Sequence, residues 1–199
     1  MTKKIGFFKR LKALNTSQKQ LFAIALCQRM YPNYQLFSNV CEFGKPEVLN
    51  TALNLLWQKQ YDQKLKLNID IYLERLEDNA PDPEKFDVYG VYPAQDAVSA
   101  LISLLSGIQS DVDEDIINIS KLSSSTVASY IEASCEQELT EAQLDDYVFA
   151  HPAMIEEKEL QEMLLEAIES NKINAEFVKG LRQEIIDLGV SNIGVSFAK

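Results

Sequence analysis

The chain has 199 residues, enough for one domain with a substantial hydrophobic core, and we expect residues 1–199 to form a single domain. Only 7 Gly and 6 Pro accompany 46% hydrophobic and 25% charged residues, a composition that argues against a turn-rich β fold and against disorder. The net charge of −11 is unevenly spread, because residues 1–41 carry seven Lys or Arg and no acidic residue, whereas residues 132–169 carry twelve carboxylates and the single cation Lys158.

The first predicted element is a short amphipathic helix at residues 5–14, with Ile5, Phe8 and Leu11 on its apolar side and basic residues among the rest. Such a helix can lie on an anionic membrane. Because it is short, we expect it instead to pack onto its own domain, towards the acidic residues 132–169.

The apolar run at residues 21–27 superficially resembles an export signal. It is only seven residues long and is followed at once by Gln28 and Arg29, which a signal peptide does not tolerate. No window of 18 consecutive apolar residues exists, so we expect no membrane span and a cytoplasmic location.

Caps and prolines predict the helices that follow. Ser17 and Gln20 match a capping box, which places a helix at about 18–30. Pro32 should end that helix, because the residue before a proline is pushed out of the α region. A separate short helix is then expected at 34–41.

Two more helices are predicted before the middle of the chain. Pro46 opens one that runs to about residue 61. Residues 65–73 alternate like a strand but match the helix template equally well. Asn68, as an N-cap, favours an extended lead-in followed by a helix to about residue 78.

The segment 93–108 is predicted to be the central buried helix. Pro93 suits the first helical position, which starts the helix at Tyr92 or Pro93. The residues after it are apolar nearly all round, which is typical of a helix surrounded by other helices. Asp96 would then either be buried with a partner or face a cleft, and burial would raise its pKa unless a cation or donors compensate. We interpret it as a structural carboxylate, with an acid or base as the alternative. The polar exceptions on this helix are Asp96, Ser99, Ser103 and Ser106.

Four further helices are predicted in the second half. A long one at about 113–137 begins with acidic residues and holds small residues that would let the central helix approach closely. Thr140 and Gln143 form a capping box for a helix to residue 150. Two more follow at about 152–170 and 174–188.

Gly189 should end the last helix, and residues 191–197 alternate polar and apolar, which predicts an extended tail. The sequence therefore predicts an all-α fold of about eight to nine helices around residues 93–108, with a short extended C-terminal tail.

No catalytic motif or metal site is recognisable. Asp111, Asp113 and Asp115 occupy positions of a calcium loop, but Ile116 and Leu122 stand where that loop requires glycine and glutamate. His151 is the only histidine and reads as a loop residue. We therefore expect no metal, no cofactor and no catalytic residue.

The three cysteines have spacings of neither a disulfide framework nor a zinc site. Free, mostly buried thiols in a reducing compartment are expected, and a nucleophilic cysteine is the alternative. They are Cys27, Cys41 and Cys135.

Three blocks of sequence resemble a known family. They are Met30-Tyr31-Pro32-Asn33-Tyr34, Tyr89-Gly90-Val91-Tyr92-Pro93-Ala94 with Asp96-Ala97, and Gly180-Leu181-Arg182 with Ser191-Asn192-Ile193-Gly194. In this order, along essentially the whole chain, they resemble the YjaG-like bacterial proteins, a domain of unknown function (416). The resemblance implies an all-helical single domain and brings no activity, and the suggested link to histidine-kinase signalling is associational.

Six polar residues in or beside these blocks stand next to helix boundaries. We hypothesise that some of them converge on a small ligand, with an arginine paired to Asp96. The alternative is that they make helix-packing hydrogen bonds and a buried ion pair. The six are Arg29, Tyr31, Tyr92, Asp96, Arg182 and Asn192.

Two functions follow from these patterns. We favour a non-enzymatic cytosolic interaction or regulatory protein, linked to signalling, that holds a basic protein partner through residues 132–169 or through exposed tyrosines. The alternative is a small-ligand-binding protein or enzyme that uses Asp96 with Arg29 or Arg182. The acidic surface disfavours nucleic acid, for which only the basic first 41 residues are a candidate. The oligomeric state stays open, and a homodimer is compatible with the sequence.

Overall fold

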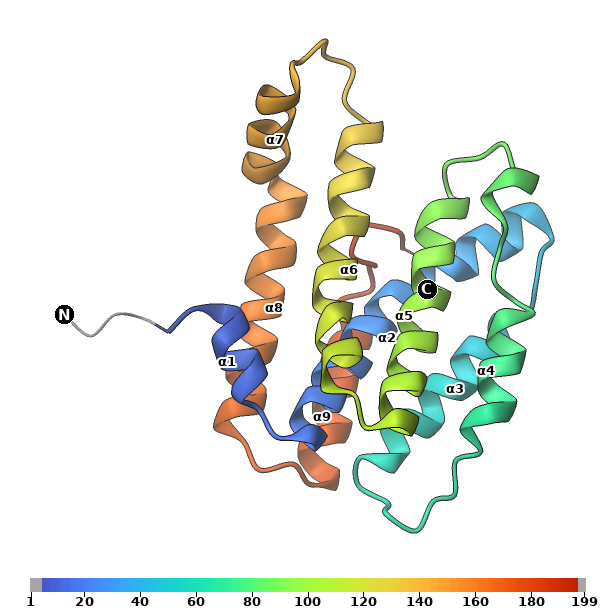
Figure 1. Ribbon diagram of the computed structural model, residues 1–199, viewed down its shortest axis with the longest axis vertical. Coiled ribbons are helices and arrows are strands. Elements are labelled where there is room, and N and C mark those ends of the chain that lie inside the picture. The colour runs from blue at the N-terminus through green and yellow to red at the C-terminus, as the bar shows by residue number, and fades with distance from the viewer. Residues whose placement is uncertain (1–4, 197–199) are drawn as a thin grey trace.

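The computed structural model describes residues 5–196, and in that range it is all-α, as predicted, with nine α-helices (Figure 1). One isolated antiparallel bridge, Val190 to Ser196, is the β structure seen in these residues. The helices are α1 (Phe7–Ala13), α2 (Thr16–Cys41), α3 (Pro46–Lys59), α4 (Ile69–Glu77), α5 (Val91–Ser110), α6 (Asp113–Ala133), α7 (Glu141–Ala150), α8 (Pro152–Ser170) and α9 (Ala175–Asp187), with a 3-10 turn at Pro83–Lys85.

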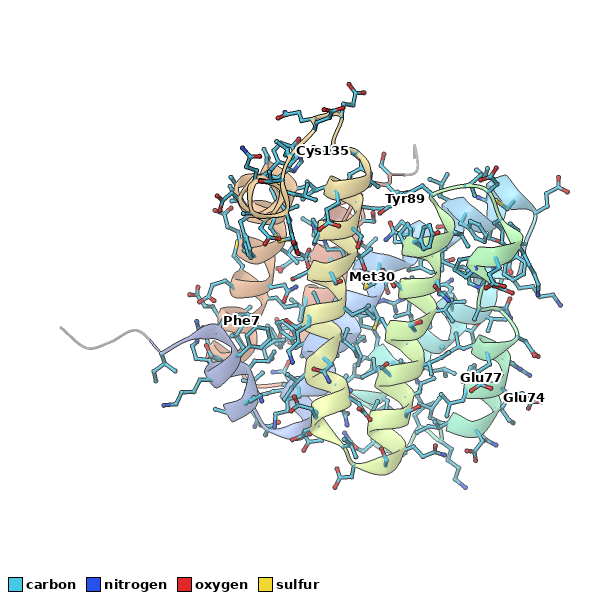
Figure 2. The ribbon with its side chains drawn as sticks, turned by 45° about the horizontal axis from the view of Figure 1, so that its top comes forward. Phe7, Met30, Glu74, Glu77, Tyr89 and Cys135 are labelled. Atoms are coloured by element: carbon cyan, nitrogen blue, oxygen red, sulfur yellow. The ribbon has the colours of Figure 1, made fainter. Side chains whose placement is uncertain are left out.

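Two helices form the centre of the fold. The longest, α2, packs against α3, α5, α6, α8 and α9, and its Met30 lies fully buried near the middle of the molecule (Figure 2). Beside it, α5 packs against α2, α4 and α6. The prediction of a buried core helix at 93–108 is confirmed, and α2 shares its central position.

The predicted break at Pro32 is wrong, because α2 runs without interruption from Thr16 to Cys41. A proline inside a helix loses one backbone hydrogen bond and crowds the preceding turn, at a cost of about 3 kcal/mol. Here Met30 on one side and Tyr34 and Phe37 on the other are buried in one hydrophobic cluster. Packing of both halves outweighs the local penalty.

The start of α2 also differs from the prediction. The capping box is formed by Asn15 and Gln18, not by Ser17 and Gln20. The latter two side chains instead hydrogen-bond to Gln60, at the end of α3. Both pairs have the three-residue spacing of a capping box, so the spacing alone does not choose between them.

This difference can be measured. Asn15→Ala removes the acceptor for the Gln18 amide, so we expect the free energy of unfolding to fall by about 1 kcal/mol in urea denaturation. Ser17→Ala loses one long hydrogen bond and should cost less. Equal losses in the two variants would contradict the assignment of Asn15 as the cap.

The first helix packs onto the rest of the molecule, as predicted, but with a different face. Leu11 is 1% exposed, and the Phe7 ring lies 6.2 Å from that of Phe22, whereas Ile5 and Phe8 are exposed. Phe7 and Leu11 are four positions apart and therefore lie on the same face of this helix, which is the face that packs against the rest of the molecule.

Most other boundaries agree with the sequence. Asn68, Thr140 and Asn174 cap their helices, while α6 ends at Ala133, four residues before the prediction. Helix α5 begins at Val91, slightly before the predicted start, so Pro93 is its third residue and not its first. A backbone N–H at this position has no intrahelical partner in any case.

The C-terminal tail is not simply extended, because Val190 and Ser196 pair across a tight turn. Residue 197 of the predicted tail lies outside the described residues. Within residues 5–196, none of the helices combines the length and apolar character needed to traverse a bilayer.

Candidate functional site: an apolar groove beside a buried ion pair

A groove lies between α6 and the pair α7 and α8, and in Figure 1 α6 runs alongside this pair. Its volume is about 650 Å³. Helix α1 contributes two aromatic residues to its wall, and the Phe149 side chain is 63% exposed. The apolar side chains that line it are Phe7, Phe8, Ala128, Val148, Phe149 and Met154.

Small side chains of α6 form the floor of the groove. Ser120, Ser124 and Ala128 lie at four-residue spacing on one face of α6 and all contribute to the lining. Because these side chains are short, a helix lying in the groove can approach the backbone of α6 closely. The groove therefore fits an elongated, apolar object better than a compact polar one.

The rim of the groove is charged. Glu132, Asp145 and Glu162 contribute to its lining, together with Lys121 and Lys158. The Lys158 ammonium lies 4.4 Å from the centroid of the Phe149 ring, and Lys121 lies 5.8 Å from that of Phe8, so both lysines are held over aromatic faces. Outside the groove lining, α7 and α8 carry further exposed acidic side chains, Glu141, Asp146, Glu156, Glu159 and Glu166.

The basic helix α1 is attached to this acidic wall. Arg10 forms ion pairs with Glu162 and Glu169 of α8, and these two carboxylates raise the pKa of its guanidinium further above the ordinary value. Lys12 lies 3.6 Å from Glu114 of α6. The prediction that the first helix packs towards the acidic residues is thus confirmed.

A fully buried carboxylate lies behind the groove. Glu157 of α8 is 0% exposed and is ion-paired with Arg29 of α2, which is 7% exposed. The Ser123 hydroxyl donates to Oε1 of Glu157 at 2.6 Å, and Nε2 of Gln161 donates to the same oxygen at 2.7 Å. The ion pair therefore joins α2, α6 and α8 in a dry environment.

This network reaches the floor of the groove through Gln161. Its Nε2 also lies 3.1 Å from the Ser120 carbonyl oxygen and 3.1 Å from Oγ of Ser124, and its Oε1 accepts from the Ser120 hydroxyl at 2.6 Å. Both the nitrogen and the oxygen of the Gln161 amide therefore have hydrogen-bond partners within the protein. The network fixes the separation of α6 and α8 and leaves the groove itself mainly apolar.

Two of the six candidate residues belong to this network. Arg29 pairs with Glu157, and Asn192 donates through Nδ2 to the Ser123 carbonyl oxygen at 3.2 Å. Asn33 in turn donates to Oδ1 of Asn192 at 2.9 Å. Both contacts are buried and agree with the alternative of a structural role.

The expected pairing of Asp96 with an arginine is wrong. Asp96 accepts a hydrogen bond from the Thr126 hydroxyl at 2.7 Å, while Arg29 pairs with Glu157 and Arg182 donates to Asn54. Burial raises the pKa of Asp96, against the opposing effect of the Thr126 hydrogen bond, and burial lowers the pKa of Arg182. The structure therefore does not assemble an anion-binding arginine beside this carboxylate.

The two candidate tyrosines lie in different surroundings. Tyr31 is half-buried on α2, and burial, together with the charge of Glu47, raises its pKa. Tyr92 is exposed, and its ring centroid lies 5.9 Å from that of Tyr89. None of the six candidates contributes to the lining of the groove.

Glu157 was missed because it lies in the run Glu156-Glu157-Lys158-Glu159, which reads as a solvated face. The available signal was its helical phase. Glu157 shares one face of α8 with Met154, Gln161, Leu164 and Ile168, all of them buried. A carboxylate on an apolar stripe predicts a buried partner.

Histidine and cysteine are the residue types that most often bind metals or act as nucleophiles. Within residues 5–196 no group of three or more His, Cys, Asp and Glu side chains is placed to hold a metal ion. His151 caps α8 by accepting from the Ala153 amide at 3.2 Å. The prediction of mostly buried thiols holds for Cys27 alone, since Cys41 and Cys135 are only partly buried. Burial raises the pKa of the Cys27 thiol, which makes it a poor nucleophile.

Known proteins match this chain over nearly its whole length. A family model described as "Protein of unknown function (DUF416)" matches residues 6–196. The "Uncharacterized protein YjaG" of Escherichia coli and that of Salmonella typhimurium are each 35% identical over 190 residues, covering 94% of this chain and 95% of theirs. An uncharacterized Haemophilus influenzae protein is 31% identical over 191 residues, with coverages of 95% and 96%. The crystal structure of a DUF416 family protein from Shewanella baltica matches with a TM-score of 0.93 and 68% identity, covering 98% of this chain and 100% of that chain.

Proposed function

The chain belongs to the DUF416 family, whose function is unknown, and we propose that it is a non-enzymatic interaction protein that binds a basic amphipathic helix of a partner protein in the groove. The helix would lie between α6 and the pair α7 and α8. Its apolar side would face the small and aromatic side chains of the groove, and its basic side would face the acidic rim. We further propose that this takes place in the cytoplasm, where free cysteine thiols persist.

The observation that carries this proposal is the position of α1, which packs beside the groove and against α8. This helix has apolar residues on one side and basic residues on the other, and its Phe7 and Phe8 already form part of the groove wall. Figure 2 shows Phe7 on the side of α1 that faces the other helices. Arg10 reaches Glu162 and Glu169 of α8. The chain thus provides an internal example of the kind of helix that this acidic wall accepts.

The remaining length of the groove suits a short helix. On α6 its lining extends from Ser120 to Glu132, which corresponds to about 18 Å along the helix axis, or about three turns of a partner helix. The 63% exposed side chain of Phe149 would be covered by such a partner, which is favourable because apolar surface is removed from water. Glu132 and Asp145, together with the exposed acidic side chains of α7 and α8 outside the lining, would chiefly speed association and select basic over acidic helices.

The test uses two designed peptides of about 15 residues, one a Leu/Lys amphipathic helix and the other its Leu/Glu counterpart. Fluorescence anisotropy with the full chain should give a micromolar dissociation constant for the Leu/Lys peptide that weakens with added salt, and no measurable binding of the Leu/Glu peptide. Equal binding of both peptides would overturn the proposal. Binding of dodecanoate with no binding of either peptide would also overturn it, because the groove would then be a lipid site.

Matched variants locate the peptide. Ala128→Trp fills the floor of the groove and should abolish binding, whereas Met163→Trp, on an exposed part of α8 outside the lining, should leave it unchanged. Circular dichroism checks that both variants are folded.

The rim is tested by charge reversal, which does not disturb the core. Glu132→Lys with Asp145→Lys should weaken binding about tenfold at low salt. The control double variant Glu176→Lys with Glu184→Lys, on α9, keeps the same net charge away from the groove. The same loss of affinity in both double variants would show only long-range attraction, and would contradict binding at the rim.

A further inference from the structure

Three tyrosines and a carboxylate meet on another side of α6. We propose that Tyr89, Tyr92, Tyr130 and Asp96 form a site for an organic cation, specifically a methylated ammonium group. The group could belong to a free choline-like molecule or to a methylated lysine of a protein, since both present the same chemistry. This site does not rest on the proposed partner of the groove, although Glu132, which lines the groove, also adds negative charge near Tyr89.

The three rings form one continuous aromatic surface. The Tyr89 ring centroid lies 5.9 Å from that of Tyr92 and 6.2 Å from that of Tyr130, and the ring planes are inclined by 49° and 52°. Inclined rings do not cover one another's faces as parallel rings would. Tyr89 lies at the start of α5, near the last turns of α6, in Figure 2. Ring faces attract cations through their quadrupole, within about 6 Å of the centroid.

Two of the three tyrosines line a second cavity, of about 260 Å³, while Tyr92 and Asp96 lie outside its lining. Tyr89 and Tyr130 line it, and most of the other lining side chains are apolar, among them Phe37, Val40 and Pro93. A compact ammonium ion would lose its water here without recovering hydrogen bonds, whereas methyl groups on the nitrogen make apolar contacts with such walls. The lining therefore favours a methylated cation over a bare one.

The negative charge comes from Asp96. This residue lies one helical turn after Tyr92, and its Oδ2 accepts the Thr126 hydroxyl at 2.7 Å. Thr126 in turn lies one helical turn before Tyr130, so the hydrogen bond between α5 and α6 holds the carboxylate one turn along from the rings of Tyr92 and Tyr130. Burial, followed by the charge of Asp96, raises the pKa of Tyr89 to about 12, in agreement with this placement. The ion pairs formed among the described residues do not include Asp96. The electrostatic compensation of this half-buried carboxylate would come from the ligand.

The rest of the chain supplies a contrast. Four other aromatic rings have a cation of the same chain over their faces: Phe8 with Lys121, Phe149 with Lys158, Tyr61 with Lys179, and Tyr72 with Arg75. Among the described residues, Tyr89, Tyr92 and Tyr130 have no such neighbour, although Asp96 and Glu132 both add negative charge near Tyr89. This aromatic and acidic cluster is therefore left for a cation from outside the chain.

Isothermal titration calorimetry of the full chain with choline and with its neutral isostere 3,3-dimethyl-1-butanol tests the charge without any mutation. We expect choline to bind at least about tenfold more tightly than the alcohol. Equal binding of the two would mean a merely apolar cavity and would overturn the proposal. The absence of binding by both choline and a short trimethyl-lysine peptide would overturn it as well. The tighter of these two ligands identifies the source of the cation.

Variants then locate the bound cation. Tyr89→Leu and Asp96→Asn should each weaken choline binding about tenfold, whereas Tyr89→Phe should retain it because the ring face remains. The matched control is Tyr72→Leu, whose ring lies under Arg75 and which should have no effect. If Tyr89→Leu and Tyr72→Leu behave alike while both remain folded by circular dichroism, the cation does not bind at Tyr89 and the proposal fails.

Discussion

Replacing Glu157 by alanine is expected to lower the free energy of unfolding by about 3–5 kcal/mol. The Glu157 carboxylate has no exposed surface and accepts hydrogen bonds from Arg29, Ser123 and Gln161. Its removal leaves the guanidinium of Arg29, which is 7% exposed, without a counter-charge. Taking a charge out of water without a partner is far more costly than losing a neutral hydrogen bond.

The control for this prediction removes both charges together. Arg29→Met with Glu157→Leu leaves no buried ion, so this double variant should recover most of the loss seen in Arg29→Met alone or in Glu157→Leu alone. Urea denaturation followed by circular dichroism and by the fluorescence of Trp57 measures the double variant, its two single variants and Glu157→Ala. A double variant as unstable as the sum of the singles would show that the hydrogen-bond network matters more than the charge. A loss below about 1 kcal/mol for Glu157→Ala would show that the site is hydrated.

Gly44→Ala is expected to be the second most damaging change, with a loss of about 2–4 kcal/mol. Gly44 has a φ of +68°, a conformation that costs an L-residue about 1–2 kcal/mol. An added Cβ would also lie 2.1 Å from the hydroxyl oxygen of Tyr34. Tyr34 is fully buried, and its hydroxyl lies 3.4 Å from Oδ1 of Asn79, so it has little room to move and crowding adds about 1–3 kcal/mol.

Gly189 provides the matched control for Gly44. Its φ is also +68°, but the nearest atom to an added Cβ lies at 3.8 Å. Gly189→Ala should therefore show the conformational cost alone, about 1–2 kcal/mol. Tyr34→Phe, which removes the crowding oxygen, should restore part of the stability of Gly44→Ala. Equal thermal shifts for Gly44→Ala and Gly189→Ala would contradict the crowding argument.

The parts of the fold that were predictable are those set by neighbouring residues. Thr140 and Asn174 start helices because their side chains satisfy amides three residues later, and that requirement is visible in the sequence. Pro32 was misjudged because its local cost is outweighed by core contacts made by distant segments. The pattern of neighbouring residues shows the local cost of the proline but not the stabilisation that comes from packing in the core.

The candidate sites were harder to predict, because they depend on which helices become neighbours. The partner of Asp96 is Thr126, thirty positions away and one of many hydroxyl residues in the chain. The partner of Arg29 is Glu157, which lies in a run of charged residues that reads as an exposed face. The groove is formed where α6 and the pair α7 and α8 face one another, so the residue pattern of any single helix does not predict it.

The long central helix α2 also has a consequence for how the chain is made. Arg29 and Glu157 are 128 positions apart, so α2 leaves the ribosome well before α8 exists to cover it. Until then the nascent chain exposes the apolar helix α2 and the unpaired guanidinium of Arg29. A nascent chain with such an exposed helix is a substrate for chaperones. Translation that stops before residue 157 therefore yields a fragment unable to close its own interior.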